Sequence, residues 1–138
     1  MPKILSQKLK TIKNDKGDIL KFFSKNNKFY SKFGEVYFSE VKQKQIKAWK
    51  MQKNIYMNLT VPVGRVKFVF YDLNFNHLKT IIIGKKKFFL LNVPPQVWYG
   101  FQGLNDQNLI VNFIEEIHND DDMLRLEKKD IIHNWSKI

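Results

Sequence analysis

Short apolar segments separated by turn residues recur along the chain, and this spacing constrains the fold more than any other feature. In residues 66–72, Val66, Phe68 and Phe70 fall on one face of an extended segment, as in a half-buried strand. Comparable segments rich in β-branched and aromatic residues recur about every 10 to 12 residues. We expect strands at residues 35–41, 46–49, 57–61, 66–72, 79–83, 88–93 and 109–114. The series predicts an all-β sandwich or barrel, with jelly rolls among the options.

Two local signals add detail to this pattern. Pro62 restricts φ two residues before Gly64, which can adopt a positive φ, so residues 61–65 predict a tight turn into the next strand. Residues 120–129 are the one place where a short helix is expected, because Asp120 to Asp122 could cap a turn or two.

The length of 138 residues fits one domain over residues 1–138, and no repeat or linker divides it. The absence of Cys excludes disulfides and a Cys nucleophile, and it is compatible with a reducing cytoplasm. No apolar stretch approaches the roughly 18 residues of a membrane span, and the N-terminus has no signal-like segment. A cytoplasmic location is therefore expected.

The net charge of +11 is concentrated in the first part of the chain. Residues 1–54 hold 14 Lys and 4 acidic residues (+10), which leaves +1 for residues 55–138. This excess either attracts phosphates, nucleic acid or an acidic membrane, or forms a solvated surface that maintains solubility. Arg65 and Arg125 are the only arginines, so sequence-specific nucleic-acid recognition is not expected.

Several segments carry a resemblance to a known family when taken in order. They are residues 34–40 (GEVYFSE), 46–49 (IKAW), 61–67 (VPVGRVK), 71–72 (YD), 93–101 (VPPQVWYGF) and the close at 131–135. The ordered set resembles the dTDP-4-dehydrorhamnose 3,5-epimerase family, especially its short sugar-epimerase relatives. The resemblance implies a cupin-type double-stranded β-helix, or jelly-roll barrel. It also implies a homodimer acting on a dTDP-linked 4-keto-6-deoxyhexose in surface-polysaccharide or lipopolysaccharide biosynthesis.

This chain has other residue types at the positions where the family has its catalytic residues. Such an epimerase needs a base for the proton α to the 4-keto group and an acid on the opposite face. In the resemblance, Lys50 stands where the base His belongs, Gln52 replaces a second barrel His, and Tyr99 replaces the His after the Pro-Pro segment. Asn112 stands at the place of the proton-donating Tyr.

Three interpretations remain open at this point. In the first, desolvated Lys50 is the base and Tyr99 the acid of an atypical isomerase. In the second, the barrel binds a nucleotide-sugar or glycan without turnover; the proposed contacts are Lys47, Lys50 and Arg65 to phosphate, with Trp49, Trp98 or Tyr99 stacking. In the third, the protein is a structural or partner subunit. A dTDP-4-keto-6-deoxyglucose 3,4-ketoisomerase, from a neighbouring cupin group with a similar Pro-Pro-x-Val-Trp segment, is the alternative enzyme.

The remaining candidates have ordinary explanations. Three scattered His and no Cys predict neither a zinc site nor any other metal or cofactor, and we interpret His77, His118 and His133 as surface or structural residues. Trp49 and Trp98 either line the pocket or pack in the core. We therefore predict Lys50 and Tyr99 as catalytic residues. The predicted substrate-binding residues are Lys47, Trp49, Gln52, Arg65, Trp98 and Asn112.

Overall fold

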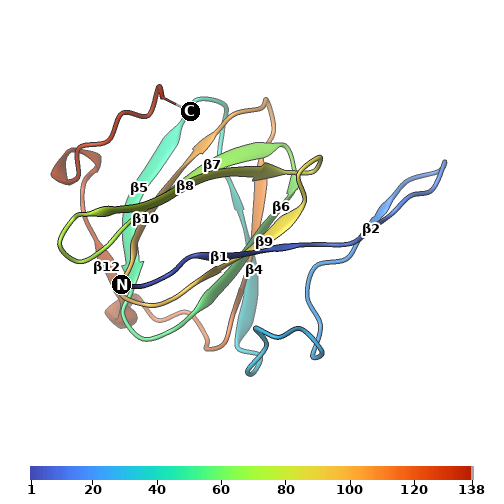
Figure 1. Ribbon diagram of the computed structural model, residues 1–138, viewed down its shortest axis with the longest axis horizontal. Helices are drawn as coiled ribbons and strands as arrows, with labels where there is room; N and C mark the ends of the chain where they lie inside the picture. The colour runs from blue at the N-terminus through green and yellow to red at the C-terminus, as the bar shows by residue number, and fades with distance from the viewer. Residues whose placement is uncertain (138) are drawn as a thin grey trace.

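The computed structural model describes residues 1–137 and is almost entirely β (Figure 1). The strands are β1 (Leu5–Lys8), β2 (Thr11–Ile12), β3 (Ile19–Leu20), β4 (Glu35–Glu40), β5 (Ile46–Gln52), β6 (Met57–Val63), β7 (Arg65–Tyr71), β8 (His77–Gly84), β9 (Phe89–Val93), β10 (Trp98–Gly103), β11 (Leu109–Ile114) and β12 (Met123–Arg125). Two short 3-10 turns, η1 (Asp120–Asp122) and η2 (Lys128–Asp130), flank β12.

Ten of these strands form two five-stranded sheets that pack face to face. The β6 sheet has the order β1-β9-β6-β11-β4, and the β10 sheet has the order β12-β5-β10-β7-β8. Neighbouring strands within both sheets are antiparallel. The predicted all-β cupin jelly roll is confirmed.

Apolar side chains from both sheets fill the space between them. Phe68, Phe70 and Phe101 from the β10 sheet meet Leu59 and Ile114 from the β6 sheet in one buried cluster. Side chains alternate between the two faces of a strand, so the neighbours of these residues point away from the barrel interior. A polar residue can therefore reach the interior only if its side chain lies on the inward face of its strand.

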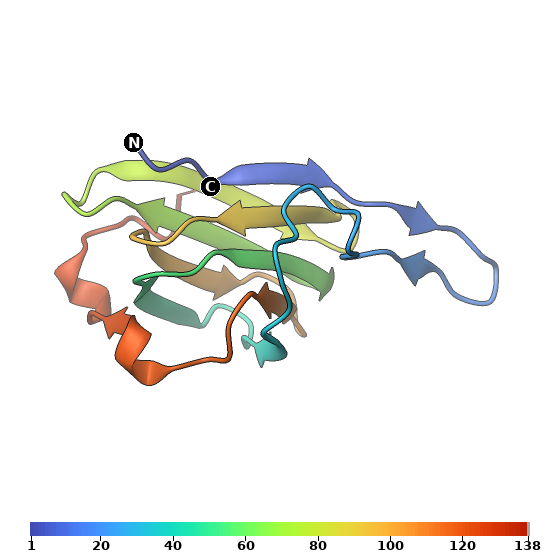
Figure 2. The ribbon, with the colours of Figure 1, turned by 90° about the horizontal axis from the view of Figure 1, so that it is seen from below.

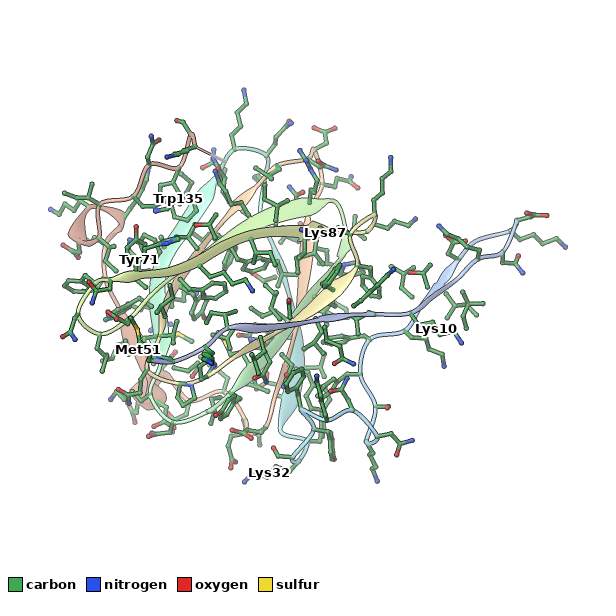
Figure 3. All side chains as sticks on the ribbon, viewed as in Figure 1. Lys10, Lys32, Met51, Tyr71, Lys87 and Trp135 are labelled. Atoms are coloured by element: carbon green, nitrogen blue, oxygen red, sulfur yellow. The ribbon has the colours of Figure 1, made fainter. Side chains whose placement is uncertain are left out.

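The outer face of the β10 sheet carries a second cluster, covered by the C-terminal segment. We call it the outer aromatic cluster; its buried members are Trp49, Met51, Val69, Tyr71, Trp98, Ile131 and Trp135. Figure 3 labels Tyr71 and Trp135, which lie on this side of the molecule beside the C-terminal chain. The cluster ties residues 126–137 to strands β5, β7 and β10.

The N-terminal part lies largely outside the two sheets. The hairpin β2–β3 projects beyond both of them in two perpendicular views (Figures 1 and 2). The following segment packs Phe22, Phe23 and Phe29 against the outer face of the β6 sheet. Within residues 1–137, no helix is long and apolar enough to cross a membrane.

The sequence-based expectations for individual elements were mostly accurate. All seven expected strands are present, and Gly64 adopts a φ of 81° between β6 and β7, which confirms the tight turn. The helical turn or two expected at residues 120–129 is confirmed in part. The structure has two 3-10 turns there, separated by β12, because residues 123–125 pair with the edge of β5.

Candidate functional site

A β-bulge in β5 places two lysines on the same side of the sheet. In a regular strand, Lys47 and Lys50 would face opposite ways because they are three residues apart. The pairing with β10 shifts at this point, so that Lys50 opposes Tyr99 and Lys47 opposes Phe101. Directly opposed residues in antiparallel strands share a face. Both lysines therefore lie on the interior face, as Tyr99 and Phe101 do, and bulges commonly re-aim side chains near active sites.

Three further polar residues of the β10 sheet share this face. Tyr99 and Gln52 are buried, and Arg125 on the edge strand β12 opposes Lys50. The Lys47 amine donates a hydrogen bond to the Glu40 carbonyl at 2.7 Å. Among the residues that the structure describes, the Lys50 amine has no hydrogen bond or ion pair. Lys50 is therefore a half-buried amine with no direct ionic partner among the described residues.

The facing β6 sheet contributes a tyrosine and an asparagine. Tyr37 and Asn112 are directly opposed on β4 and β11, and the Asn112 side-chain amide donates to the Tyr37 hydroxyl at 2.8 Å. Asn112 Oδ1 and Gln52 Nε2 are buried without a hydrogen-bond partner. A buried unpaired polar atom carries a free-energy cost of about 1–3 kcal/mol, so one acceptor and one donor are left for a ligand to satisfy.

A loop after β11 completes the group at its exposed side. His118 Nε2 lies 3.0 Å from Asp120 Oδ1, which also accepts from Arg125 Nη2 at 3.3 Å. The His118 ring packs edge-on to Tyr37 with centroids 6.4 Å apart. We call the whole group the polar ring: Tyr37, Lys47, Lys50, Gln52, Tyr99, Asn112, His118, Asp120 and Arg125.

The surroundings of the polar ring shift the protonation of its members. Desolvation, and then the charges of Arg125 and Lys47, lower the pKa of Lys50, while Asp120 opposes this shift. Burial raises the pKa of the Tyr99 hydroxyl, with Tyr37 adding to the effect. Burial also raises the pKa of Tyr37, and the hydrogen bond from Asn112 partly offsets this. The ring thus combines an amine whose pKa is lowered with two phenols whose pKa is raised.

Not all predicted residues come together at the polar ring. The structure brings together Lys47, Lys50, Gln52, Tyr99 and Asn112. Trp49 and Trp98 lie instead in the outer aromatic cluster, so the expectation that they line the pocket is corrected. The bulge directs Trp49 outward, and Trp98 precedes inward-facing Tyr99 by one residue.

Arg65 is also corrected as a member of the site. It opens β7 one residue before inward-facing Val66, and it is exposed, so it lies on the outer face next to the Gly64 turn. Its predicted role as a phosphate contact is not supported, since Arg125 is the arginine that borders Lys50.

Sequence reasoning missed four members of the polar ring: Tyr37, His118, Asp120 and Arg125. Tyr37 could have been found from the alternation of β4, where Glu35, Tyr37 and Ser39 share one face and Val36, Phe38 and Glu40 the other. Arg125 and His118 gave no signal, because their positions depend on β12 pairing and on the fold of the 115–122 loop.

Neither a metal cluster nor a deep surface pocket defines an alternative site. Within the described residues, no group of three or more His, Cys, Asp or Glu side chains could hold a metal ion. A hollow of about 680 Å³ beside the N-terminal hairpin is lined by Lys8, Lys13, Lys85 and Lys86, among others. It contains only one acid, Asp18, which Lys13 already pairs, so the polar ring is the better candidate for chemistry.

Comparison with known proteins finds similar structures but no match by sequence family. No protein-family model matches the chain, and no curated protein sequence matches it significantly. A dTDP sugar isomerase from Desulfovibrio desulfuricans G20 superposes with a TM-score of 0.89 and 29% identity, covering 98% of this chain and 92% of that one. The chain is thus similar in structure to a dTDP sugar isomerase over nearly the whole length of both chains.

Two further structures in this group are more distant in sequence. The sugar 3,4-ketoisomerase QdtA from Thermoanaerobacterium thermosaccharolyticum, in complex with TDP, gives a TM-score of 0.77 at 18% identity over 93% of this chain and 91% of that one. The 3,5-epimerase RmlC from Legionella pneumophila Philadelphia 1, in complex with dTDP-4-keto-L-rhamnose, gives 0.79 at 13% identity over 92% and 74%. At these identities the likeness establishes a shared fold. The three structures are those of a dTDP sugar isomerase, a 3,4-ketoisomerase and a 3,5-epimerase, and all share the fold of this chain.

Proposed function

We propose that this cupin isomerises a dTDP-linked 4-keto-6-deoxyhexose by moving a proton α to the keto group within the polar ring. The observation that carries the proposal is the arrangement of Lys50 and Tyr99 on one sheet, opposite Tyr37 and Asn112 on the other. Epimerisation needs proton-transfer groups on both faces of a sugar ring, and the two sheets supply one set each. In the simplest form of this mechanism, the neutral Lys50 amine is the base that accepts the proton α to the keto group.

The charges of the ring suit an anionic ligand. Lys47 and Arg125 carry positive charge beside Lys50, against Asp120 and the neighbouring Glu35. A nucleoside diphosphate would gain charge-assisted hydrogen bonds from these groups. The unpaired Gln52 Nε2 and Asn112 Oδ1 offer a donor and an acceptor to sugar hydroxyls or the keto oxygen.

Exchange of solvent deuterium into dTDP-4-keto-6-deoxyglucose, followed by NMR, tests this function. We expect exchange at C3, C5 or both above the buffer rate. Inversion at these carbons would identify an epimerase, and transfer of the keto group from C4 to C3 would identify a 3,4-ketoisomerase, as the QdtA neighbour is described. Binding without exchange would overturn the isomerase proposal.

The positive charges of Lys47 and Arg125 also favour a second candidate, a cupin that binds a nucleotide-sugar without turnover. A thermal-shift panel with dTDP, UDP, GDP and CDP tests this, because a ligand that binds only the native state raises the melting temperature. A shift without exchange would support binding alone, whereas no shift with any nucleotide at about millimolar concentration would contradict it.

We further propose the setting in which the reaction takes place. Residues 1–138 would act as one cupin domain, in a homodimer, in the cytoplasm and in surface-polysaccharide biosynthesis. The lack of Cys supports a reducing compartment, and the resemblance to the epimerase family supports the dimer and the pathway. Sedimentation of the purified chain would test the dimer; a monomeric mass across the working concentration range would contradict it.

A further inference from the structure

The surroundings of Lys50 differ from those of an ordinary structural lysine. Its amine lies on the interior face between Tyr99 and Arg125, and no carboxylate of residues 1–137 pairs with it. The nearest acid that affects it, Asp120, already bonds His118 and Arg125. Cationic neighbours and partial burial are the conditions under which a lysine amine becomes neutral and nucleophilic.

We propose that Lys50 acts as a covalent nucleophile, whose amine forms an imine with the carbonyl carbon of the keto-sugar. The inference rests on the proposed function, since it requires a carbonyl substrate in the polar ring. It replaces the simplest form of that function, in which Lys50 only accepts a proton.

Tyr99 supports the formation of this imine because it directly opposes Lys50. The lone pair of Nζ forms a bond to the carbonyl carbon, and the carbonyl oxygen takes a proton from the Tyr99 hydroxyl. The resulting phenolate recovers a proton from the nitrogen, which gives a neutral carbinolamine. The carbinolamine hydroxyl then leaves as water with a second proton from Tyr99. The products are a protonated imine on Lys50 and a Tyr99 phenolate beside it.

The imine also gives Tyr99 the role of base. Burial raises the pKa of Tyr99, so its phenolate, once formed next to the iminium cation, is a strong base. It removes the proton α to the imine carbon, and the bonding electrons move to nitrogen to form a neutral enamine. The iminium is a better electron sink than a ketone, so the α proton becomes more acidic and Tyr99 can remove it.

Tyr37 can complete the reaction from the other sheet. Its hydroxyl, held by Asn112, returns a proton to the α-carbon from the opposite face and regenerates the iminium. Solvent water restores the Tyr37 proton and accepts the one left on Tyr99. One water then adds to the iminium and loses a proton to the Tyr99 phenolate, which releases the ketone and the free Lys50 amine and restores the Tyr99 hydroxyl. The cycle consumes no oxidant or reductant and yields an inverted α-carbon.

Reductive trapping tests the proposal directly. The full chain is incubated with dTDP-4-keto-6-deoxyglucose and sodium cyanoborohydride, followed by intact-mass measurement and peptide mapping. We expect one sugar nucleotide per chain, attached at Lys50 about tenfold more than at the exposed Lys86. Lys50→Arg keeps the charge but should lose the adduct, whereas the control Lys86→Arg should be labelled like the wild-type chain. Mapping of the wild-type chain is decisive even if a variant fails to fold.

The outcomes separate this inference from the proposed function. Deuterium exchange without an adduct at Lys50 would overturn the imine and leave the isomerase intact. Labelling spread evenly over surface lysines and unchanged in Lys50→Arg would also overturn the imine. Binding with neither exchange nor adduct would overturn both proposals.

Discussion

The two faces of the β10 sheet differ in how fully their buried polar groups are hydrogen-bonded. On the outer face, the Lys67 amine donates to the carbonyls of Trp135 and Lys137, although it is almost completely buried. Tyr71 hydrogen-bonds to His133, and the Trp49 indole donates to the Lys128 carbonyl. Trp135 Nε1 is the unpaired exception. On the inner face, Lys50 and Gln52 Nε2 have no partner among the described residues.

This difference distinguishes polar residues that stabilise the fold from polar residues that are available to a ligand, within one sheet. Buried polar groups that have hydrogen-bond partners are compatible with a stable fold, whereas unpaired ones lower the free energy of unfolding. Unpaired buried groups are therefore rare in native proteins unless a ligand or water provides the missing hydrogen bond. Lys67 and Lys50 are two lysines on adjacent regions of the same sheet, and their surroundings assign them different roles. Substitutions on the outer face should therefore lower the free energy of unfolding, and substitutions on the inner face should lower the rate of proton exchange into the substrate.

The largest effect on stability is expected for Lys67→Ala. The substitution removes a buried aliphatic stem and leaves two carbonyls of the C-terminal segment without their donor, which should cost about 3 kcal/mol. Urea unfolding measures the change, and Lys86→Ala at an exposed turn should stay within about 0.5 kcal/mol of the wild-type chain. A Lys67→Ala variant as stable as this control would break the comparison.

A somewhat smaller loss is expected for Gly100→Ala. The added methyl group would lie 2.8 Å from the Ala48 side chain and 3.0 Å from the Trp49 ring, so we expect destabilisation by about 2 kcal/mol. Thermal unfolding measures it. The double variant Gly100→Ala with Ala48→Gly should recover part of the loss, and equal stability of the single variant and the wild-type chain would refute close packing at this point.

Gln52→Leu should stabilise the fold, in contrast to the two substitutions above. Removal of an unpaired buried amide should raise the free energy of unfolding by about 1 kcal/mol, while slowing deuterium exchange into the substrate. Gln102→Leu is the matched control, because the Gln102 amide already donates to the Lys44 carbonyl at 3.2 Å. A loss of stability in Gln52→Leu larger than in this control would show that Gln52 is structural.

The smallest effect is a pH dependence from His133. Desolvation, and then the nearby His77 and Lys67, lower the pKa of His133, so the unfolded chain binds its proton more readily than the folded one. Stability should therefore fall as the pH drops from the ordinary His pKa of about 6.5 toward the lowered value in the folded chain. Besides His77 and Lys67, the group facing His133 is the Tyr71 hydroxyl.

Urea unfolding between about pH 7 and 5 measures this slope. His133→Gln should reduce the slope, since the substituted side chain does not titrate. An unchanged slope in the variant would assign the effect to other groups.

Most of the fold could be predicted from the sequence because alternation and turn residues are local signals. The segment at residues 109–114 has the same bounds as β11, and β6 to β9 were also expected close to where they lie. β10 was missed because Gly100 and Gly103 resemble loop residues, although Gly100 is required by the close approach of Trp49. β12 was missed because three residues pair only through the edge of β5.

The site could be predicted only where a residue's face follows from regular alternation or from the resemblance. The β5 bulge changes that alternation, and no sequence signal locates it. It directs Trp49 outward and Lys50 inward. The prediction that Trp49 lines the pocket was therefore wrong, whereas Lys50 is a member of the polar ring. Arg125 replaced Arg65 as the nearby arginine for a similar reason, since strand pairing brings together residues far apart in the chain.

Deuterium exchange by Lys50→Met, measured beside the wild-type chain, tests the central claim most directly. The substitution keeps the length of the side chain and removes its amine, so the fold should be retained while exchange at C3 and C5 falls by about 10² to 10⁴-fold. Circular dichroism and urea unfolding verify the fold in the same samples. Exchange at the wild-type rate in a folded Lys50→Met variant would contradict the assignment of chemistry to the inner face.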